Sequence, residues 1–442
     1  MVPSAKNLSL SRAIAYSSIF AVSTAISFLA PGFTQQSRAA WEESPKTVVD
    51  QAWQIVYRNY VDPDFNQVDW LAIREELLSR EYSSPDHAYR ALKEVLEDLE
   101  DPYTRFMDPE QYQALTNQTT GELLGIGVRL KNDAVSGDLV VEEPLQNSPA
   151  MDAGVQPGDR IVAIDGTSAK GMNTRQAAEL IRGEEGSEVV IDLLRDGRPL
   201  QLTLQRARVE VPSVNYSVKQ ENNQRIGYIR LTQFTSHAAR EMRQAIRELT
   251  REGVDSFVLD LRGNPGGLLY ASIDIARMWL DTGTIVRTTN RENQDEAIMA
   301  TKTALTDLPL AVLVDGNSAS SSEILAGALQ DNNRAVVIGS KTFGKALVQS
   351  LHPLADGSGI AVTIAHYYTP DGTDLNARGV IPDIAVNLSR VQQRLLQRQP
   401  QSLATGIDAQ YSRAVDYLKS QRFVTPTTQP PAQLSGNVEA LQ

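Results

Sequence analysis

The arrangement of the chain can be inferred from residues 308–329, which read LPLAVLVDGNSASSSEILAGAL. The run from Leu308 to Val314 is short, apolar and ended by Asp315-Gly316, which is typical of a buried strand. The run from Glu323 to Leu329 predicts a helix. A strand, a tight turn, a serine and a helix place a hydroxyl at the tip of a sheet, beside the free N–H groups of the helix start. Ser320 is therefore a candidate nucleophile.

A purely structural role for this serine is also open. Ser320 and Glu323 fit the Ser-x-x-Glu capping box, in which two residues satisfy each other's backbone N–H groups at a helix start. Lys345 gives the serine a possible chemical partner, because it follows a second apolar run, Ala335 to Ile338, that predicts the next strand. A βαβ unit would return Lys345 to the sheet edge that carries Ser320.

The neighbours of Lys345 favour a role as a base. Phe343 and residues 346–348 are apolar or small and would desolvate the amine. Desolvation disfavours the charged form, so it lowers the pKa of a lysine toward a value at which the amine accepts a proton. Gln349 follows four residues later, a spacing that keeps both side chains on one face of a helix or a strand, where an amide could orient the lysine.

The same lysine also fits a phosphate-binding loop. Gly339 to Lys345 matches Gly-x-x-x-x-Gly-Lys after a predicted strand. The next residue of such a loop is Ser or Thr, which holds magnesium, whereas this chain has Ala346. A helix should follow, whereas Asp356-Gly357 and Gly359 interrupt the segment and Ile360 to Tyr368 predicts a strand. The sequence therefore departs from that motif at two points.

Three motifs in this order resemble the carboxyl-terminal processing peptidases, tail-specific serine proteases with a Ser/Lys dyad. They are residues 317–324, residues 326–331 and residues 342–349, and the resemblance extends from about Trp41 to about Asn387. It implies that Ser320 is the nucleophile, Lys345 the general base and Gln349 the residue that orients the lysine. Ala346 stands where the family usually has glycine, which matters only if that position needs a positive φ.

The resemblance also implies an oxyanion hole. A predicted strand, Phe257 to Leu261, ends in Arg262-Gly263-Asn264-Pro265-Gly266-Gly267, which carries more glycine and proline than a plain connection needs. By resemblance, Gly266 or Gly267 supplies one backbone donor and Ser321 supplies the other. This loop belongs to a predicted α/β serine protease domain of crotonase-like βα units, residues 208–393. In that domain Arg225 to Leu231 predicts a strand and Ser236 to Glu252 a helix capped by Thr235 or Ser236.

Two further modules precede this domain. Residues 40–118 predict an N-terminal helical domain, because apolar residues recur at helical spacing, and Leu99 to Phe106 resembles the corresponding family segment. Residues 119–207 resemble an inserted PDZ domain. Backbone N–H groups around Leu124, Gly125, Ile126 and Gly127 would then bind a terminal carboxylate, and a free strand edge would pair with the incoming tail. The alternative is a small β module that only braces its neighbours.

Both ends of the chain lie outside the predicted domains. Two basic residues precede an apolar run from Ala13 to Ala30, and small residues follow, so residues 1–39 predict a signal peptide cleaved after Ala39 or Ala40. An uncleaved anchor is the alternative. Residues 394–442 predict a C-terminal helix, Ile407 to Leu418, and a disordered tail from Thr425 to Pro431.

Composition limits the partners. The 442 residues carry a net charge of −12 without a basic block, which argues against nucleic acid or an anionic membrane as the main partner. The chain has no cysteine, so disulfides and thiolate catalysis are excluded, and its four histidines lie in no metal-binding spacing. We therefore predict no metal and no cofactor. A Ser-His pair with one of these histidines stays open.

These features together predict an exported serine endopeptidase that captures protein substrates by an exposed, apolar C-terminus and cleaves near it. The segment from Tyr60 to Trp70 resembles the branch found in oxygenic phototrophs. That branch implies the periplasm or thylakoid lumen, a photosystem II reaction-centre precursor as substrate, and proximity to the membrane through that substrate. The alternatives are a non-catalytic PDZ chaperone, a nucleotide-binding protein and a crotonase-like enzyme acting on acyl thioesters. The oligomeric state is not predicted.

Overall fold

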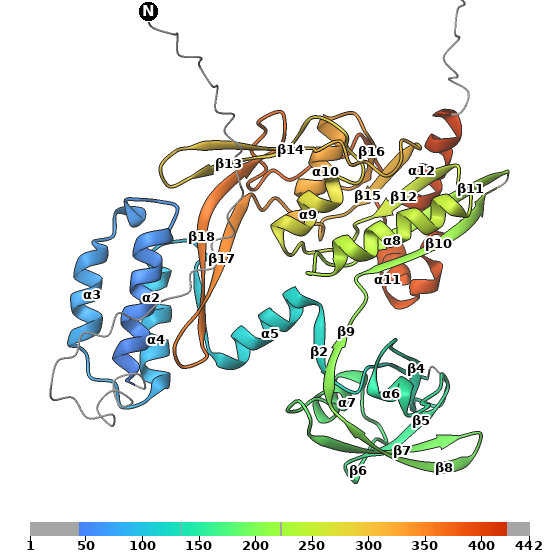
Figure 1. Cartoon of the computed structure of the whole chain (residues 1–442), viewed down its shortest axis with the longest axis horizontal. Coiled ribbons are helices and arrows are strands. Elements are labelled where there is room, and N and C mark those ends of the chain that lie inside the picture. The colour runs from blue at the N-terminus through green and yellow to red at the C-terminus, as the bar shows by residue number, and fades with distance from the viewer. Residues whose placement is uncertain (1–43, 134, 222, 422–442) are drawn as a thin grey trace, which may run out of the picture. The chain divides into compact units, whose positions relative to one another are not determined.

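The computed structural model describes residues 44–133, 135–221 and 223–421 (Figure 1). The predicted signal peptide, residues 1–39, and the predicted disordered segment from Thr425 to Pro431 lie outside the described residues. Within the described ranges, no helix is both long and apolar enough to cross a membrane.

A six-stranded sheet forms the centre of the α/β part. Its strands are parallel except for the first, which is an antiparallel edge. The two inner strands β12 and β15 are buried along their whole length, as expected for parallel strands covered on both faces. In spatial order the sheet contains β10 (Val214–Glu221), β11 (Gln224–Leu231), β12 (Ser256–Asp260), β15 (Leu310–Val314), β16 (Val336–Gly339) and β19 (Ile384–Ala385).

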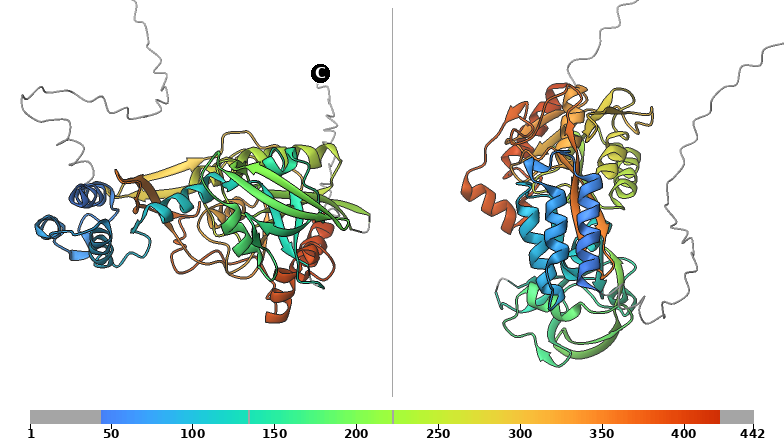
Figure 2. Two further views of the ribbon diagram at one scale, coloured as in Figure 1. Left: turned by 90° about the horizontal axis from the view of Figure 1, so that it is seen from below. Right: turned by 90° about the vertical axis from the view of Figure 1, so that its left-hand side faces the viewer.

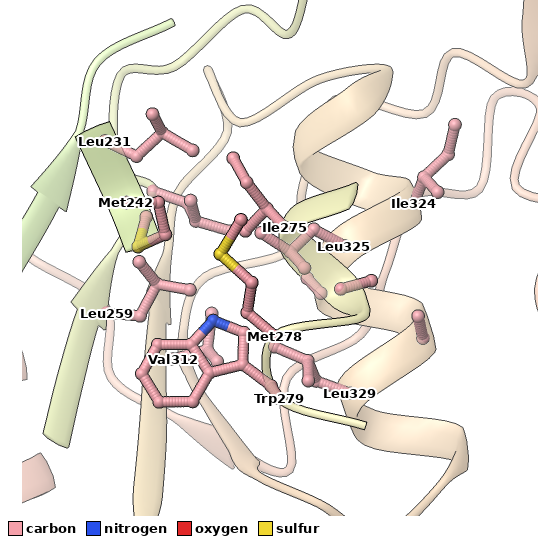
Figure 3. Packing of buried hydrophobic residues seen from close by; sticks show 14 of the residues in the cluster. Leu231, Met242, Leu259, Ile275, Met278, Trp279, Val312, Ile324, Leu325 and Leu329 are labelled. Carbon is pink, nitrogen blue, oxygen red and sulfur yellow. The ribbon is translucent and has the colours of Figure 1, made fainter. Parts of the chain in front are cut away.

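Helices cover both faces of this sheet. Alternate residues of β15 point to opposite layers: Val312 packs with α8, α9 and α10 (Figure 3), and Leu313 packs with α12. The indole of Trp279 packs within this layer and is almost fully buried (Figure 3). The helices are α8 (Ala238–Arg251), α9 (Leu269–Ala276), α10 (Ser321–Asp331), α11 (Arg390–Arg398) and α12 (Ala409–Gln421), with a 3-10 turn η2 (Pro400–Ser402).

Helix α8 begins two residues later than the sequence predicts. Neither expected cap acts as one: Thr235 shares a hydrogen bond with Ser213, and Ser236 donates its hydroxyl to the carbonyl of Thr120. His237 occupies the N-cap position without a side-chain cap. Both hydroxyls are used in contacts with distant segments, which a local capping rule does not consider.

A second sheet joins the N-terminal segment to the α/β part. The short strand β1 pairs with β18 at Phe106 and its neighbours. The sequence predicts only helices in the N-terminal segment, so this strand is a difference from the prediction. The helices α2, α3 and α4 lie side by side (Figure 2); α2 and α4 pack on this sheet through Phe106, Ile360 and Val362, and α3 packs on α2. The elements are α2 (Pro45–Asn59), η1 (Phe65–Gln67), α3 (Trp70–Ser79), α4 (Pro85–Glu97), β1 (Arg105–Met107), α5 (Pro109–Thr120), β13 (Thr284–Asn290), β14 (Asp295–Met299), β17 (Leu347–Pro353) and β18 (Gly359–Tyr368).

Residues 122–210 form a β module entered and left through a two-stranded ribbon. The ribbon pairs β2 (Glu122–Gly125) with β9 (Ala207–Glu210). The module's sheet has β3 at one edge, so among the described residues one side of β3 has no neighbouring strand. Its elements are β3 (Val128–Asn132), β4 (Leu139–Pro144), α6 (Pro149–Asp152), β5 (Arg160–Ile164), β6 (Thr167–Ser168), α7 (Thr174–Ile181), β7 (Glu188–Arg195) and β8 (Arg198–Gln205).

A buried ionic cluster attaches α12 to the end of β12. Arg262 donates to Asp260 and to both carboxylate oxygens of Asp408, whose side chain has no exposed surface. Burial opposes the charged guanidinium, but the two carboxylates hold the pKa of Arg262 well above its usual value. The C-terminal helix therefore supports the loop that starts at Arg262.

Asp408→Asn tests this attachment. Removing one charge leaves Arg262 and Asp260 buried in an incomplete cluster, so we expect the free energy of unfolding to fall by about 3 kcal/mol. Urea unfolding measures the change. Asp416→Asn, on the exposed side of the helix that follows Asp408, is the matched control and should change stability by less than about 0.5 kcal/mol. Equal stability of the two variants would contradict the structural role given to Asp408.

Candidate active site

Ser320 lies on a strained turn between β15 and α10. Its backbone has φ 54° and ψ −115°, a conformation that L-residues rarely adopt and that costs on the order of 1–3 kcal/mol. The Ser320 N–H donates to Oε2 of Glu323 at 2.8 Å, which is one half of the predicted capping box. The turn thus projects the hydroxyl from the end of a buried strand, as the sequence predicts.

The serines that flank Ser320 fasten this turn to the loop after β12. Each uses its hydroxyl to donate to a backbone carbonyl of residues 261–267, so the two loops are held edge to edge. The bonds are Ser318 Oγ to Leu261 O, Ser321 Oγ to Gly267 O and Ser322 Oγ to Asn264 O, each 2.9 Å long. The abundance of serine in this segment therefore has a structural cause, apart from Ser320 itself.

Two backbone donors near Ser320 are free. Within the described ranges, the N–H groups of Gly267 and Ser321 meet no acceptor, whereas the N–H of Gly266 donates to Asn264 Oδ1 at 2.9 Å. Gly266 has φ 101°, and a Cβ there would lie 2.9 Å from the Cβ of Ser320. Gly266 thus permits the close approach of the loop, and Gly267 and Ser321 fit the two-donor arrangement expected of an oxyanion hole.

The buried carboxylate of Glu323 ties the serine turn to the lysine loop. Besides the N–H of Ser320, it accepts the hydroxyl of Thr342 at 2.5 Å and the N–H groups of Gly344 at 2.7 Å and Lys345 at 3.0 Å. Because Oε2 accepts from both Ser320 and Lys345, the backbone nitrogens of these two residues lie within about 6 Å of each other. The βαβ unit thus brings both loops to one sheet edge, as predicted.

The same contacts are unlike those of a phosphate-binding loop. The N–H groups of Gly344 and Lys345 are taken by a carboxylate, and the segment continues into strand β17. Ala346 is fully buried and has no positive φ, so a methyl group in place of the family's glycine is tolerated there.

The amine of Lys345 is partly buried and lies 4.2 Å from the centre of the Tyr103 ring. Burial, reinforced by the positive charge of Arg105, lowers the pKa of Lys345 to about 8, although Asp101 and Glu323 act in the opposite direction. Within the described part of the chain the amine forms no hydrogen bond to Ser320 or Gln349. The structure therefore brings the loops together without pairing the two side chains.

Gln349 lies on β17 and points to a polar network. Its amide nitrogen is 3.5 Å from the hydroxyl of Thr363, which donates to Asp101 at 2.6 Å. Asp101 also accepts the hydroxyl of Thr104 at 2.7 Å. Gln349 is thus connected to the segment that carries Tyr103, and its predicted contact with the lysine stays a prediction.

Sequence reasoning missed several neighbours of the dyad. Tyr367 on β18 donates its hydroxyl to the carbonyl of Lys345. Burial raises the pKa of Tyr367 well above its usual value, and hydrogen bonding with Ser320 partly offsets this rise. Glu323 was recognised only as a cap. Tyr103 and Asp101 lie in the segment that resembles the family's N-terminal domain, which was the one signal that could have found them.

The segment from Leu124 to Gly127 does not form one continuous strand. It is split between the end of β2 and a turn, with Gly127 at φ 73°, where a Cβ would lie 2.4 Å from that of Ser148. Ile126 anchors the turn in the core of the β module. The turn leads directly into the free edge of β3, the arrangement that a tail-binding groove requires. Across the described ranges, no group of three or more potential ligands gathers that could hold a metal ion.

Comparisons with known proteins agree with this arrangement. Residues 225–386 match Peptidase family S41, and residues 140–195 match the PDZ domain. The carboxyl-terminal-processing protease of a Synechocystis species is 42% identical over 86% of this chain and 88% of its own. A chloroplastic carboxyl-terminal-processing peptidase 2 of Arabidopsis thaliana is 39% identical over 75% of this chain and 67% of its own.

Solved structures give the same result. A photosystem II D1 C-terminal processing protease is 37% identical, with a TM-score of 0.51 over 78% of this chain and 93% of its own. The α/β fold, the PDZ domain and the sequence relatives all indicate the same family. The chain belongs to peptidase family S41 and is a serine-type, carboxyl-terminal processing peptidase with a PDZ domain.

Proposed function

We propose that Ser320 is the nucleophile and Lys345 the general base of this peptidase. The observation that carries the proposal is the shared carboxylate of Glu323, which holds the loops of both residues together. At a pKa of about 8, roughly a tenth of the lysine is neutral at pH 7 and able to accept a proton. Because the two side chains are not yet paired, the amine moves to the hydroxyl before the reaction.

The chemistry then follows from the site. Lys345 removes the proton of Ser320, and the hydroxyl oxygen attacks the carbonyl carbon of a peptide bond. The N–H groups of Gly267 and Ser321 stabilise the oxyanion, a contribution on the order of 3 kcal/mol for each donor. The lysine gives its proton to the leaving amine, and water later hydrolyses the acyl-enzyme. Gln349 keeps the role of orienting the lysine once the amine has moved, and Gly266 shapes the loop.

The PDZ domain supplies the recognition of the tail in this proposal. The turn from Leu124 to Gly127 receives the terminal carboxylate, and the extended tail pairs with the free edge of β3. Substrates are proteins with exposed, apolar C-termini. The proposal extends to export into the periplasm or thylakoid lumen and to a photosystem II precursor, supported by the cyanobacterial and chloroplast relatives and by the D1 processing protease. Cleavage of the D1 precursor tail faster than of an unrelated apolar tail tests this last step.

Cleavage of a folded reporter with an unstructured apolar tail tests the dyad. We expect Ser320→Ala and Lys345→Ala each to lose at least about a thousandfold in kcat/KM, because the nucleophile and its base act as one unit. Lys341→Ala is the matched control, an exposed lysine of the same loop, and should retain activity. Full activity of Lys345→Ala would show that another group is the base. Tail binding without cleavage by the wild type would instead indicate a PDZ chaperone.

The pH dependence gives a second test. Neutral Lys345 is the active form and its pKa is lowered to about 8, chiefly by burial. We expect kcat/KM to rise tenfold per pH unit below an inflection near pH 8 and to level off above it. A stopped assay on the reporter from pH 5.5 to 10 measures the profile. A flat profile between pH 6 and 9 is incompatible with this lysine as the base.

Glu323→Gln tests the carboxylate that joins the two loops. An amide cannot accept four hydrogen bonds, so at least one buried donor loses its partner and the free energy of unfolding should fall by about 2–3 kcal/mol. We expect kcat/KM to fall at least a hundredfold in protein that is still folded by circular dichroism. Wild-type kcat/KM in this variant would mean that the carboxylate is not needed to align the dyad.

A further inference from the structure

The ring of Tyr103 lies against the amine of Lys345. Lys345 Nζ lies 4.2 Å from the ring centre, well inside the range of a cation–π contact. Such a contact stabilises the protonated amine and not the neutral one, because only a cation is attracted by the ring quadrupole. The contact therefore acts on the same equilibrium that the general base uses.

Tyr103 is held at this place by its own segment. Its N–H donates to Asp101 Oδ1 at 2.9 Å, and Thr104 donates its hydroxyl to the other oxygen of the same carboxylate. The segment is also joined to β18, since the N–H of Thr363 donates to Thr104 Oγ1 at 3.0 Å. The ring is thus fixed relative to the strand that lies beside the lysine loop.

Three charged groups and one buried phenol also act near the amine; they come from β1 and the segment before it, from α10 and from β18. Arg105 on β1 repels the ammonium, whereas Asp101 and, from α10, Glu323 attract it. From β18, Tyr367 contributes a hydroxyl that donates to the Lys345 carbonyl. None of these groups forms a hydrogen bond or ion pair with the amine within the described ranges. The ring of Tyr103, at 4.2 Å from the amine, is therefore a direct contact that favours a protonated lysine over a neutral one.

We propose that Tyr103 is a positioning residue for Lys345: its ring holds the protonated amine away from Ser320 and releases it when the proton is lost. The proposal rests on the proposed role of Lys345 as the base. A protonated lysine beside Ser320 could not accept the hydroxyl proton, so the ring retains the inactive form. Only the neutral amine is free to reach the hydroxyl. The ring thus links the protonation state of the lysine to its place in the site.

The test compares Tyr103→Leu, which removes the ring, with Tyr103→Phe, which keeps it. In a Ser320→Ala background, the rate of acetylation of Lys345 by acetic anhydride, followed by mass spectrometry from pH 6 to 10, gives the pKa of the amine without any need for catalysis. We expect this pKa to fall by roughly 0.5 to 1.5 units with leucine and to stay unchanged with phenylalanine. The kcat/KM profile of the same position-103 variants with Ser320 intact should shift to lower pH by the same amount.

The outcomes separate this proposal from the proposed function. An unchanged lysine pKa in Tyr103→Leu, or an equal shift in both variants, would overturn the role of the ring. A shifted pKa in a chain that cleaves nothing would keep Tyr103 as the partner of Lys345 and reject the catalytic role. A purely structural role would lower activity at every pH without moving the profile.

Fluorinated phenylalanines at position 103 keep the test valid if the leucine variant does not fold. Successive fluorine atoms weaken the ring quadrupole and leave its size nearly constant. The pKa of Lys345 should fall stepwise from phenylalanine to trifluorophenylalanine. A constant pKa along the series would rule out the cation–π contact.

Discussion

The carboxylate of Glu323 is the interaction on which the site depends. It is fully buried at the start of α10 and accepts hydrogen bonds from both loops that carry the proposed dyad. A buried carboxylate is costly unless its lone pairs are satisfied, so the loops must stay in place for the charge to be tolerated. The serine turn depends on the carboxylate in turn, because the hydrogen bond from the Ser320 N–H to Glu323 holds the strained backbone of Ser320 in place.

The positions of the oxyanion donors follow from the same constraint. Among the residues that the structure describes, the N–H of Ser321 has no acceptor, and the hydroxyl of Ser321 donates to the carbonyl of Gly267. The carbonyl of Gly266 lies in the same peptide plane as the N–H of Gly267 and accepts from the N–H of Phe234 at 3.0 Å, so this donor is also held in place. Preorganised donors of this kind need no rearrangement when the oxyanion forms, which is the source of their effect. Arg262 and Asp408 support the same loop from the opposite side of the sheet.

The sequence was sufficient for the features that a βαβ unit determines. The strand before Ser320, the helix after it and the return of Lys345 to the same edge all follow from periodicity and chain direction. Contacts between distant segments could not be predicted in this way. The segment of Tyr103 is held beside β18 by the pairing of β1 and by the hydrogen bonds of Thr363, and Thr235 is not a cap because its hydroxyl is bonded to Ser213. Three residues of β1 carry too little periodicity to be recognised as a strand.

The proposed base is therefore built from two parts of the chain with different tasks. The α/β core places its backbone through Glu323, whereas the N-terminal segment sets the surroundings of its amine through Asp101, Tyr103 and Arg105. These two controls are separable, since one acts on the backbone of Lys345 and the other on its amine. A change that moves β1 against β18 would alter the proton affinity of Lys345 without breaking the serine turn. The N-terminal helices, which pack on the same sheet, are thus connected to the chemistry through β1 and through β18 itself.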